Sequence, residues 1–148
     1  MTIERASRED IPALLALENE CFSEPWSEKG FEDFFALDFT AALKAVEGEK
    51  TVGYAGLYIS GADGDITNVA VTASARRKGV GRALIEGLKA LPVENLFLEV
   101  RESNLPAISL YESAGFARDG LRKNFYSNPR ENAILMSYRK ENNAHPII

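Results

Sequence analysis

A basic, glycine-containing segment near the middle of the chain has the composition of a phosphate-binding loop. Four cations and two glycines lie within seven residues, 76–82. An apolar run precedes this segment and residues at helical spacing follow it, so we expect a strand, a loop and a helix start. A helix start offers unpaired N–H groups and a positive dipole end, and glycine lets backbone approach a ligand closely. The segment therefore predicts a phosphate or pyrophosphate site made by Arg76, Arg77, Lys78, Gly79, Val80, Gly81 and Arg82.

Two common nucleotide-binding motifs are excluded at this segment. It lacks the Gly-Lys-Ser/Thr of a Walker loop, and Leu84 occupies the third glycine position of a dinucleotide fingerprint. The structural alternative is a solvated turn before a surface helix.

Two further side chains have types suited to proton transfer. Glu99 lies in the apolar run 96–100, where burial would raise the pKa of its carboxyl group into a range useful to a general base. Tyr111 lies in an expected helix, and its hydroxyl can donate a proton as a general acid. Each also has a structural interpretation. Glu99 could pair with Arg101 or face solvent, and Tyr111 could be a core aromatic beside Phe116.

The elements that must position these residues follow two patterns. Three β-rich runs joined by short glycine-containing turns are typical of an antiparallel meander. Strands and helices then alternate, which requires crossovers and some parallel pairing. We therefore expect one α/β domain, residues 1–140, with a mixed central sheet, an antiparallel N-terminal meander and helices on both faces, then a flexible tail, 141–148. Strands are expected at 2–5, 41–46, 51–60, 66–71, 96–100, from 116 and at 133–138; helices from Ser7 or Asp10 to Cys21, Ser27 to Leu37, Val80 to Leu91 and Asn104 to Ser113; and a turn at Gly61–Gly64.

Composition excludes several classes of function. The 148 residues carry a formal charge of −5, which argues against non-specific nucleic-acid binding. Cys21 is the only cysteine and His145 the only histidine, so disulfides, cysteine-rich zinc sites and a Ser-His-Asp triad are not expected. The N-terminus lacks a signal-peptide pattern, and no run approaches the ~20 apolar residues of a membrane span. We expect a cytoplasmic protein without a membrane partner.

The N-terminal third combines acidic and aromatic residues and allows two interpretations. It could receive a basic peptide, or it could be two helices with solvated acidic faces over an aromatic core. Cys21 is expected to be a small core residue. The acidic residues are Glu18, Glu20, Glu24, Glu28, Glu32 and Asp33, and the aromatic ones are Trp26, Phe31, Phe34 and Phe35.

Two motifs carry a resemblance to a known family. Arg76-x-x-Gly79-x-Gly81 is similar to the acetyl-CoA pyrophosphate motif of the GNAT family of N-acetyltransferases. The segment 104–116 resembles the second signature of that family, Asn-x-x-Ala-x-x-Leu-Tyr-x-x-x-Gly-Phe. Shorter segments resemble the RimI-like branch, the ribosomal-protein alanine N-acetyltransferases, although Asn132 replaces the second acid of an acidic pair. These segments are Pro25-Trp26-Ser27, Leu98-Glu99-Val100-Arg101 and Arg122-Lys123-Asn124-Phe125-Tyr126.

The resemblance implies a GNAT fold, acetyl-CoA as co-substrate and no metal. It implies that segment 76–82 binds the pyrophosphate, that Asn104 holds the CoA arm, and that Glu99 accepts a proton through water while Tyr111 acts as the acid. It also implies that the backbone of one strand pairs with the pantetheine and assists at the carbonyl oxygen. That strand segment is Val69, Ala70 and Val71, and Trp26 and Tyr126 are the candidate acceptor-binding residues.

The chemistry of the acceptor favours an N-terminal amine. An α-amine with a pKa near 7.7–8.0 is about one-tenth neutral at pH 7, whereas a lysine near 10.4 is roughly one two-thousandth neutral. A single modest base therefore suits the α-amine better. The resemblance implies an alanine-starting, basic ribosomal protein as partner. An acetyltransferase for internal lysines, a small amine or a polyamine, and a non-catalytic acyl-CoA-binding module, are the alternatives.

Overall fold

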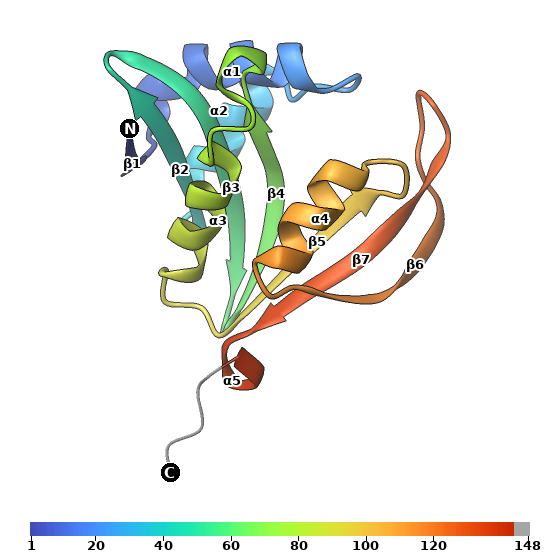
Figure 1. Ribbon diagram of the computed structural model, residues 1–148. Coiled ribbons are helices and arrows are strands. Elements are labelled where there is room, and N and C mark those ends of the chain that lie inside the picture. Colours follow the sequence, from blue (N-terminus) through green and yellow to red (C-terminus); the bar gives the residue numbers. More distant parts are fainter. Residues whose placement is uncertain (144–148) are drawn as a thin grey trace.

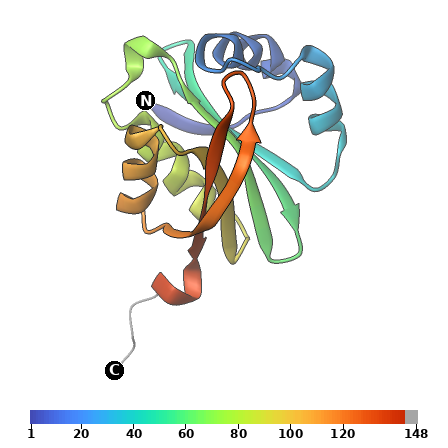
Figure 2. The same ribbon diagram turned by 90° about the vertical axis from the view of Figure 1, so that its right-hand side faces the viewer.

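The computed structural model describes residues 1–143 and consists of one mixed sheet covered on both faces (Figures 1 and 2). The seven strands follow the order β1-β2-β3-β4-β5-β7-β6, and all neighbours pair antiparallel except β4 and β5. This confirms the predicted GNAT-type mixed sheet with its N-terminal meander. The strands are β1 (Thr2–Arg5), β2 (Thr40–Glu47), β3 (Lys50–Ser60), β4 (Asp63–Val71), β5 (Asn95–Arg101), β6 (Ala117–Tyr126) and β7 (Glu131–Arg139); the helices are α1 (Ile11–Cys21), α2 (Glu28–Ala36), α3 (Val80–Lys89), α4 (Leu105–Ser113) and α5 (Lys140–Asn143), with short 3₁₀ turns at Arg8–Asp10 and Ala73–Ala75.

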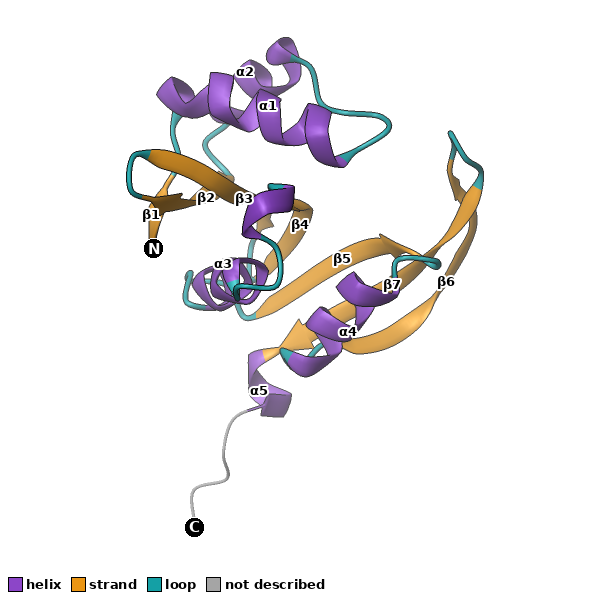
Figure 3. Cartoon of the chain, turned by 45° about the horizontal axis from the view of Figure 1, so that its top comes forward, coloured by secondary structure: helices purple, strands orange, loops and turns teal. Residues whose placement is uncertain are grey.

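Two hydrophobic clusters lie on opposite faces of the sheet. Alternate residues of β2 divide between them: Leu43 belongs to the cluster that includes α3 and α4, whereas Ala42 belongs to the cluster that includes α1 and α2. Figure 3 shows the two helix pairs on either side of the strands. The expected placement of helices on both faces is therefore confirmed.

Local signals in the sequence placed most helix starts correctly. The Ser27 hydroxyl accepts a hydrogen bond from the Gly30 amide at 3.0 Å at the start of α2. The Asn104 side chain accepts one from the Ala107 amide at 3.2 Å at the start of α4. Both are N-cap bonds, which satisfy amides that have no partner within the helix.

Several expected boundaries were wrong, among them those of one turn and of the third helix. The turn predicted at Gly61–Gly64 is shorter, because Asp63 and Gly64 already belong to β4. A Cβ on Gly64 would press against Leu57, so packing rather than turn geometry explains this glycine. The third helix ends at Lys89 instead of continuing to Leu91.

The sheet opens into a wedge between β4 and β5. These strands pair only over Asp63–Asp65 and Asn95–Phe97, and then diverge (Figure 1). From Ile66 to Val71, β4 bonds to β3 on one side and has no β5 partner on the other. Within this stretch β4 also bulges, because Thr67 and Asn68 together lie opposite Gly56.

The C-terminal end is only partly described. Lys140–Asn143 form a helical turn, whereas the tail was predicted to be flexible from residue 141. The rest of that prediction, residues 144–148, lies outside the described residues. Among the residues described, no helix is both long and apolar enough to span a membrane.

Candidate active site

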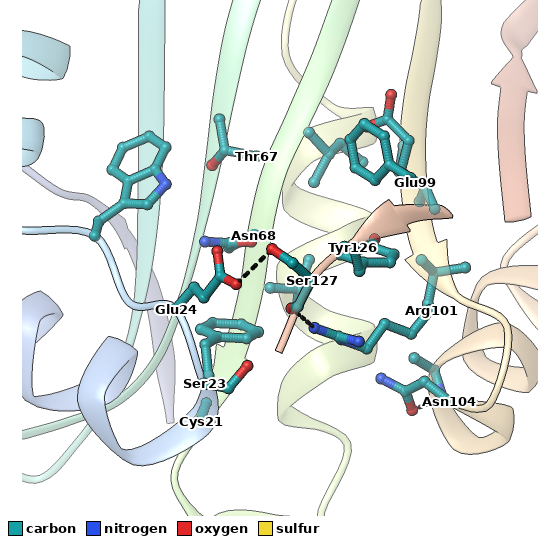
Figure 4. A pocket seen from close by; sticks show the side chains of 18 of the residues that line it. Cys21, Ser23, Glu24, Thr67, Asn68, Glu99, Arg101, Asn104, Tyr126 and Ser127 are labelled. Atoms are coloured by element: carbon teal, nitrogen blue, oxygen red, sulfur yellow. Dashed lines mark hydrogen bonds between the residues drawn. The ribbon is translucent and has the colours of Figure 1, made fainter. Parts of the chain in front are cut away.

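A cavity of about 560 Å³ occupies the wedge between β4 and β5 (Figure 4). Its walls come from the α1–α2 loop, the bulged part of β4, β5, α4 and the loop between β6 and β7. Six residues singled out in the sequence line it together: Trp26, Val69, Glu99, Asn104, Tyr111 and Tyr126.

Glu99 faces the cavity, but it is not buried. It lies on the face of β5 opposite Leu98 and Val100, as alternation predicts, and 38% of its side chain is exposed. The expectation that Glu99 is buried was therefore wrong. The nearest cation is Arg122, with 3.9 Å between nitrogen and carboxylate oxygen, whereas Arg101 pairs with Glu131 instead. The Glu99 carboxylate is thus accessible to solvent.

Tyr111 serves both in the core and on the cavity wall. Only 8% of the residue is exposed, and its ring lies 5.8 Å from that of Phe116. Burial, with a smaller contribution from nearby Tyr126, raises the pKa of Tyr111 to about 12. Within residues 1–143 the hydroxyl has no hydrogen-bond partner, and it is not among the fully buried unpaired atoms. The hydroxyl is therefore not fully enclosed, and Tyr111 is one of the residues that line the cavity.

The basic loop lies beside the cavity rather than in its wall. Arg77 and Gly79 have left-handed backbone conformations, with φ of 64° and 81°. The first bond into α3 runs from the Ala83 amide to the Gly79 carbonyl at 3.0 Å, so the preceding amides are those that a helix start leaves unpaired. Gly81 contacts α4, because a Cβ there would lie 3.1 Å from Leu110. This backbone fits a pyrophosphate group.

The four cations of the loop are not equivalent. Arg76 donates to the Val71 carbonyl at 3.0 Å, and Arg82 pairs with Glu86 at 3.2 Å. In the described part of the chain, Arg77 and Lys78 make no ion pair and are exposed. These two cations are the most available to an anion.

The acidic N-terminal residues divide by position. Glu18 is fully buried, and Glu20 accepts hydrogen bonds from Thr72 and the Ala73 amide, which lower the pKa of its carboxyl group. Of the six acidic residues, only Glu24 lines the cavity. The interpretation of the acidic residues as a solvated face therefore fails for Glu18. The interpretation of them as a surface that receives a peptide has support only from Glu24, because the others do not line the cavity.

Cys21 was expected to be a small core residue, and it packs, partly buried, against the cluster of α1 and α2 rather than inside it. It is half-buried at the cavity edge, where its Sγ lies 3.5 Å from the Val71 carbonyl and 3.5 Å from an Arg76 nitrogen.

The loop between β6 and β7 is held over the cavity by side chains that the sequence did not identify as a group. Arg101 donates to the carbonyls of Ser127 and Pro129 at 3.1 and 2.9 Å and pairs with Glu131 at 3.2 Å. Ser127 then donates to Glu24 at 2.9 Å across the cavity (Figure 4). No sequence signal indicates this last bond, because its partners are 103 residues apart.

Tyr126, the other candidate acceptor-binding residue, lies on the cavity wall. The Arg101 guanidinium lies 4.4 Å from the centre of its ring. Burial, followed by the negative charge of Glu99, raises the pKa of Tyr126 to about 12. Its hydroxyl therefore stays protonated at neutral pH.

Comparison with known proteins gives the family. Residues 11–116 match the model of the Acetyltransferase (GNAT) family. The chain belongs to the GNAT family. It is 35% identical over 142 residues to the ribosomal protein bS18 alanine N-acetyltransferase of Escherichia coli, covering 92% of this chain and 95% of that one. It is 32% identical to a protein of Bacillus subtilis described as a putative enzyme of the same type, covering 86% and 88%.

Solved structures agree with this assignment. The crystal structure of the Escherichia coli ribosomal-protein alanine N-acetyltransferase superposes with a TM-score of 0.86 at 34% identity, covering 93% of this chain and 92% of that one. The Ard1 structure from Thermoplasma volcanium superposes with a TM-score of 0.82 at 26% identity, covering 93% and 96%. The resemblance to the RimI-like branch is therefore confirmed. Within the described residues, no group of three or more His, Cys, Asp or Glu side chains is arranged to hold a metal ion.

Proposed function

We propose that this GNAT protein is an acetyl-CoA-dependent N-acetyltransferase that modifies the N-terminal α-amine of a protein, an alanine-starting ribosomal protein. The observation that carries the proposal is that Glu99 and Tyr111 line one cavity from different elements, at the open wedge between β4 and β5. The names of the relatives in Escherichia coli and Bacillus subtilis support this acceptor. A ribosomal-protein acceptor places the reaction in the cytoplasm.

Acetyl-CoA fits this protein as a substrate that extends from the basic loop into the wedge. The amides of residues 77–82, with Arg77 and Lys78, would hold its pyrophosphate. The unpaired β4 edge at residues 69–71 would bond to the pantetheine amides as a strand does. The Asn104 oxygen already caps α4, so its amide nitrogen is the group available to the CoA arm.

The reaction requires a new C–N bond, a broken C–S bond and two proton movements. The neutral amine attacks the thioester carbonyl, and the carbonyl can be polarised by β4 backbone N–H groups. Glu99 takes the proton lost by the amine, through a water molecule because this carboxylate is open to solvent. Tyr111 gives its proton to the departing thiolate. No metal is needed for any of these steps.

The acceptor side of the cavity suits a peptide terminus. Trp26 and Tyr126 provide apolar walls, and Glu24 provides a carboxylate without a cationic partner among the described residues. The β6–β7 loop, held by Arg101, covers this end. A peptide that enters beneath the loop would bring its α-amine toward Glu99.

A peptide panel tests the function. The purified protein is incubated with acetyl-CoA and peptides that begin with alanine, the same peptides with a blocked N-terminus, and internal-lysine or polyamine acceptors, and products are located by mass spectrometry. We expect one acetyl group on the α-amine of the alanine peptide and none on its blocked form. Labelling only of lysines or small amines would refute the N-terminal assignment, and CoA binding without any transfer would indicate a non-catalytic module.

A further inference from the structure

Glu18 is a fully buried carboxylate without a cation beside it in the described part of the chain. One oxygen accepts the Trp26 backbone amide at 2.8 Å. The other accepts the Tyr54 hydroxyl and the Asn68 side-chain nitrogen, the latter at 2.7 Å. A buried charge is costly unless hydrogen bonds compensate it, so these three donors are what makes Glu18 tolerable there. The carboxylate thereby connects α1 to β3, to the β4 bulge and to the loop before α2.

This network determines which way the Asn68 amide faces. The Asn68 side-chain nitrogen donates to the Glu18 carboxylate, so the nitrogen end of this amide faces Glu18. Figure 4 shows that nitrogen directed away from Glu99 and Tyr126. The side-chain oxygen of Asn68 must then face the other way.

That oxygen is a free acceptor in the cavity. Asn68 lines the cavity, and within residues 1–143 its Oδ1 accepts no hydrogen bond. In the same region the only fully buried side-chain atom without a partner is Thr67 Oγ1, so the Asn68 oxygen is accessible. Glu18 thus makes this part of β4 present an acceptor rather than a donor.

We propose that the side-chain oxygen of Asn68 receives an N–H of the incoming amino group, and that Glu18 is the positioning residue that holds the Asn68 amide in this orientation. The assignment rests on the proposed function for the identity of the acceptor, an α-amine. An amine needs one N–H held by a fixed acceptor so that its lone pair can face the thioester. Glu99 cannot supply that fixed contact alone, because its carboxylate is exposed and is bonded through water in the proposed reaction.

Binding to the CoA-saturated protein tests the assignment without requiring turnover. Calorimetry compares an alanine-starting peptide with the same peptide acetylated at its N-terminus. We expect wild type to bind the free amine at least tenfold more tightly, as hydrogen bonds to charged groups allow. Asn68→Ala should lose most of this preference while its affinity for the acetylated peptide stays the same.

Two more variants distinguish a role of Glu18 in orienting Asn68 from a merely structural role. Glu18→Gln can turn the Asn68 amide, so it should lose the preference to the same extent, and the double variant should lose no more than either single one. Tyr54→Phe is the control, since it removes the Tyr54 hydroxyl, which contacts both Glu18 and Asn68, but keeps the bond between Glu18 and the Asn68 nitrogen. It should keep the preference. If Glu18→Gln does not fold, Asn68→Ala and Tyr54→Phe decide the question.

Several results overturn the assignment: no free-amine preference in wild type, an undiminished preference in Asn68→Ala, equal weakening of both peptides, or the same selective loss in Tyr54→Phe. The proposed function fails separately. If the peptide panel shows no α-amine transfer while Asn68→Ala abolishes the preference, the assignment of Asn68 stands and the acetyltransferase activity does not.

Discussion

Replacing Tyr111 by phenylalanine tests the proposed acid with little structural change. The ring packs in the core against Phe116, the residue lines the cavity, and the hydroxyl is the only polar group of the side chain. Phenylalanine keeps the ring and removes only the group that can give a proton. Stability and acetyl-CoA binding should therefore be close to wild type, and any loss of rate reports the missing proton donor.

The raised pKa sets the size of the effect. Full proton transfer from Tyr111, with a pKa of about 12, to a thiolate whose thiol has a pKa near 8.5 is uphill by about 3.5 units, or ~5 kcal/mol. Water, with a pKa near 15.7, is a poorer acid by a further ~4 units, or ~5 kcal/mol. Because the proton is only partly transferred in the transition state, Tyr111 lowers the barrier relative to water by only part of this second difference. We expect kcat to fall by about 10² to 10⁴, the usual range for general acid catalysis.

The pH dependence follows from the same pKa. A pKa raised above that of free tyrosine means that Tyr111 keeps its proton at every pH up to about 11, so its ionisation cannot cause a loss of activity between pH 6 and pH 10. The assay follows thiol release at saturating acetyl-CoA and peptide over that range. Tyr111→Phe should lower the whole profile without changing its shape. A loss below tenfold, or a wild-type decline between pH 8 and 10 that disappears in the variant, would refute the reasoning.

Three other changes give separate expectations. Glu99→Gln keeps the shape but removes the proton acceptor, so turnover should fall tenfold or more with an unchanged acetyl-CoA thermal shift; wild-type turnover would remove Glu99 from the mechanism. Arg101→Ala removes the side chain that holds the β6–β7 loop, so the KM for peptide should rise while the KM for acetyl-CoA stays the same. Glu131→Gln removes only the ion pair with Arg101, so the KM for peptide should rise less. Equal changes in both KM values would contradict this. Gly56→Ala places a Cβ against Thr67 Oγ1, so urea denaturation should show a loss of about 1–3 kcal/mol, and a stability equal to wild type argues against that close approach.

Interactions between near neighbours made much of this fold predictable. The caps at Ser27 and Asn104 bond to amides three residues later, so the sequence alone contains both partners. Alternation along β5 likewise placed Glu99 and Leu98 on opposite faces. The basic loop could be located because strand, glycines and helix start are contiguous in the chain.

Burial and distant contacts were less predictable. Glu99 stands in an apolar run and was expected to be buried, yet the opening of the wedge exposes it. Glu18 stands among acidic residues, which one of the two interpretations placed on a solvated face, yet it is buried with donors up to 50 residues away. In both cases the environment of the carboxylate depends on elements far along the chain, which local patterns do not describe.

The bulge in β4 is a feature that local sequence patterns do not predict and that also shapes the site. Strict alternation would place Ile66, Asn68 and Ala70 on one face, but Ile66 packs in the cluster of α3 and α4, whereas Ala70 packs in that of α1 and α2. The extra residue at the bulge reverses the alternation, and Gly56 gives it room. Because the reversal occurs between Ile66 and Ala70, the Asn68 amide can bond to buried Glu18 and still present its oxygen to the cavity. One inserted residue in one strand thus links the core under α1 to the site where the amine must be held.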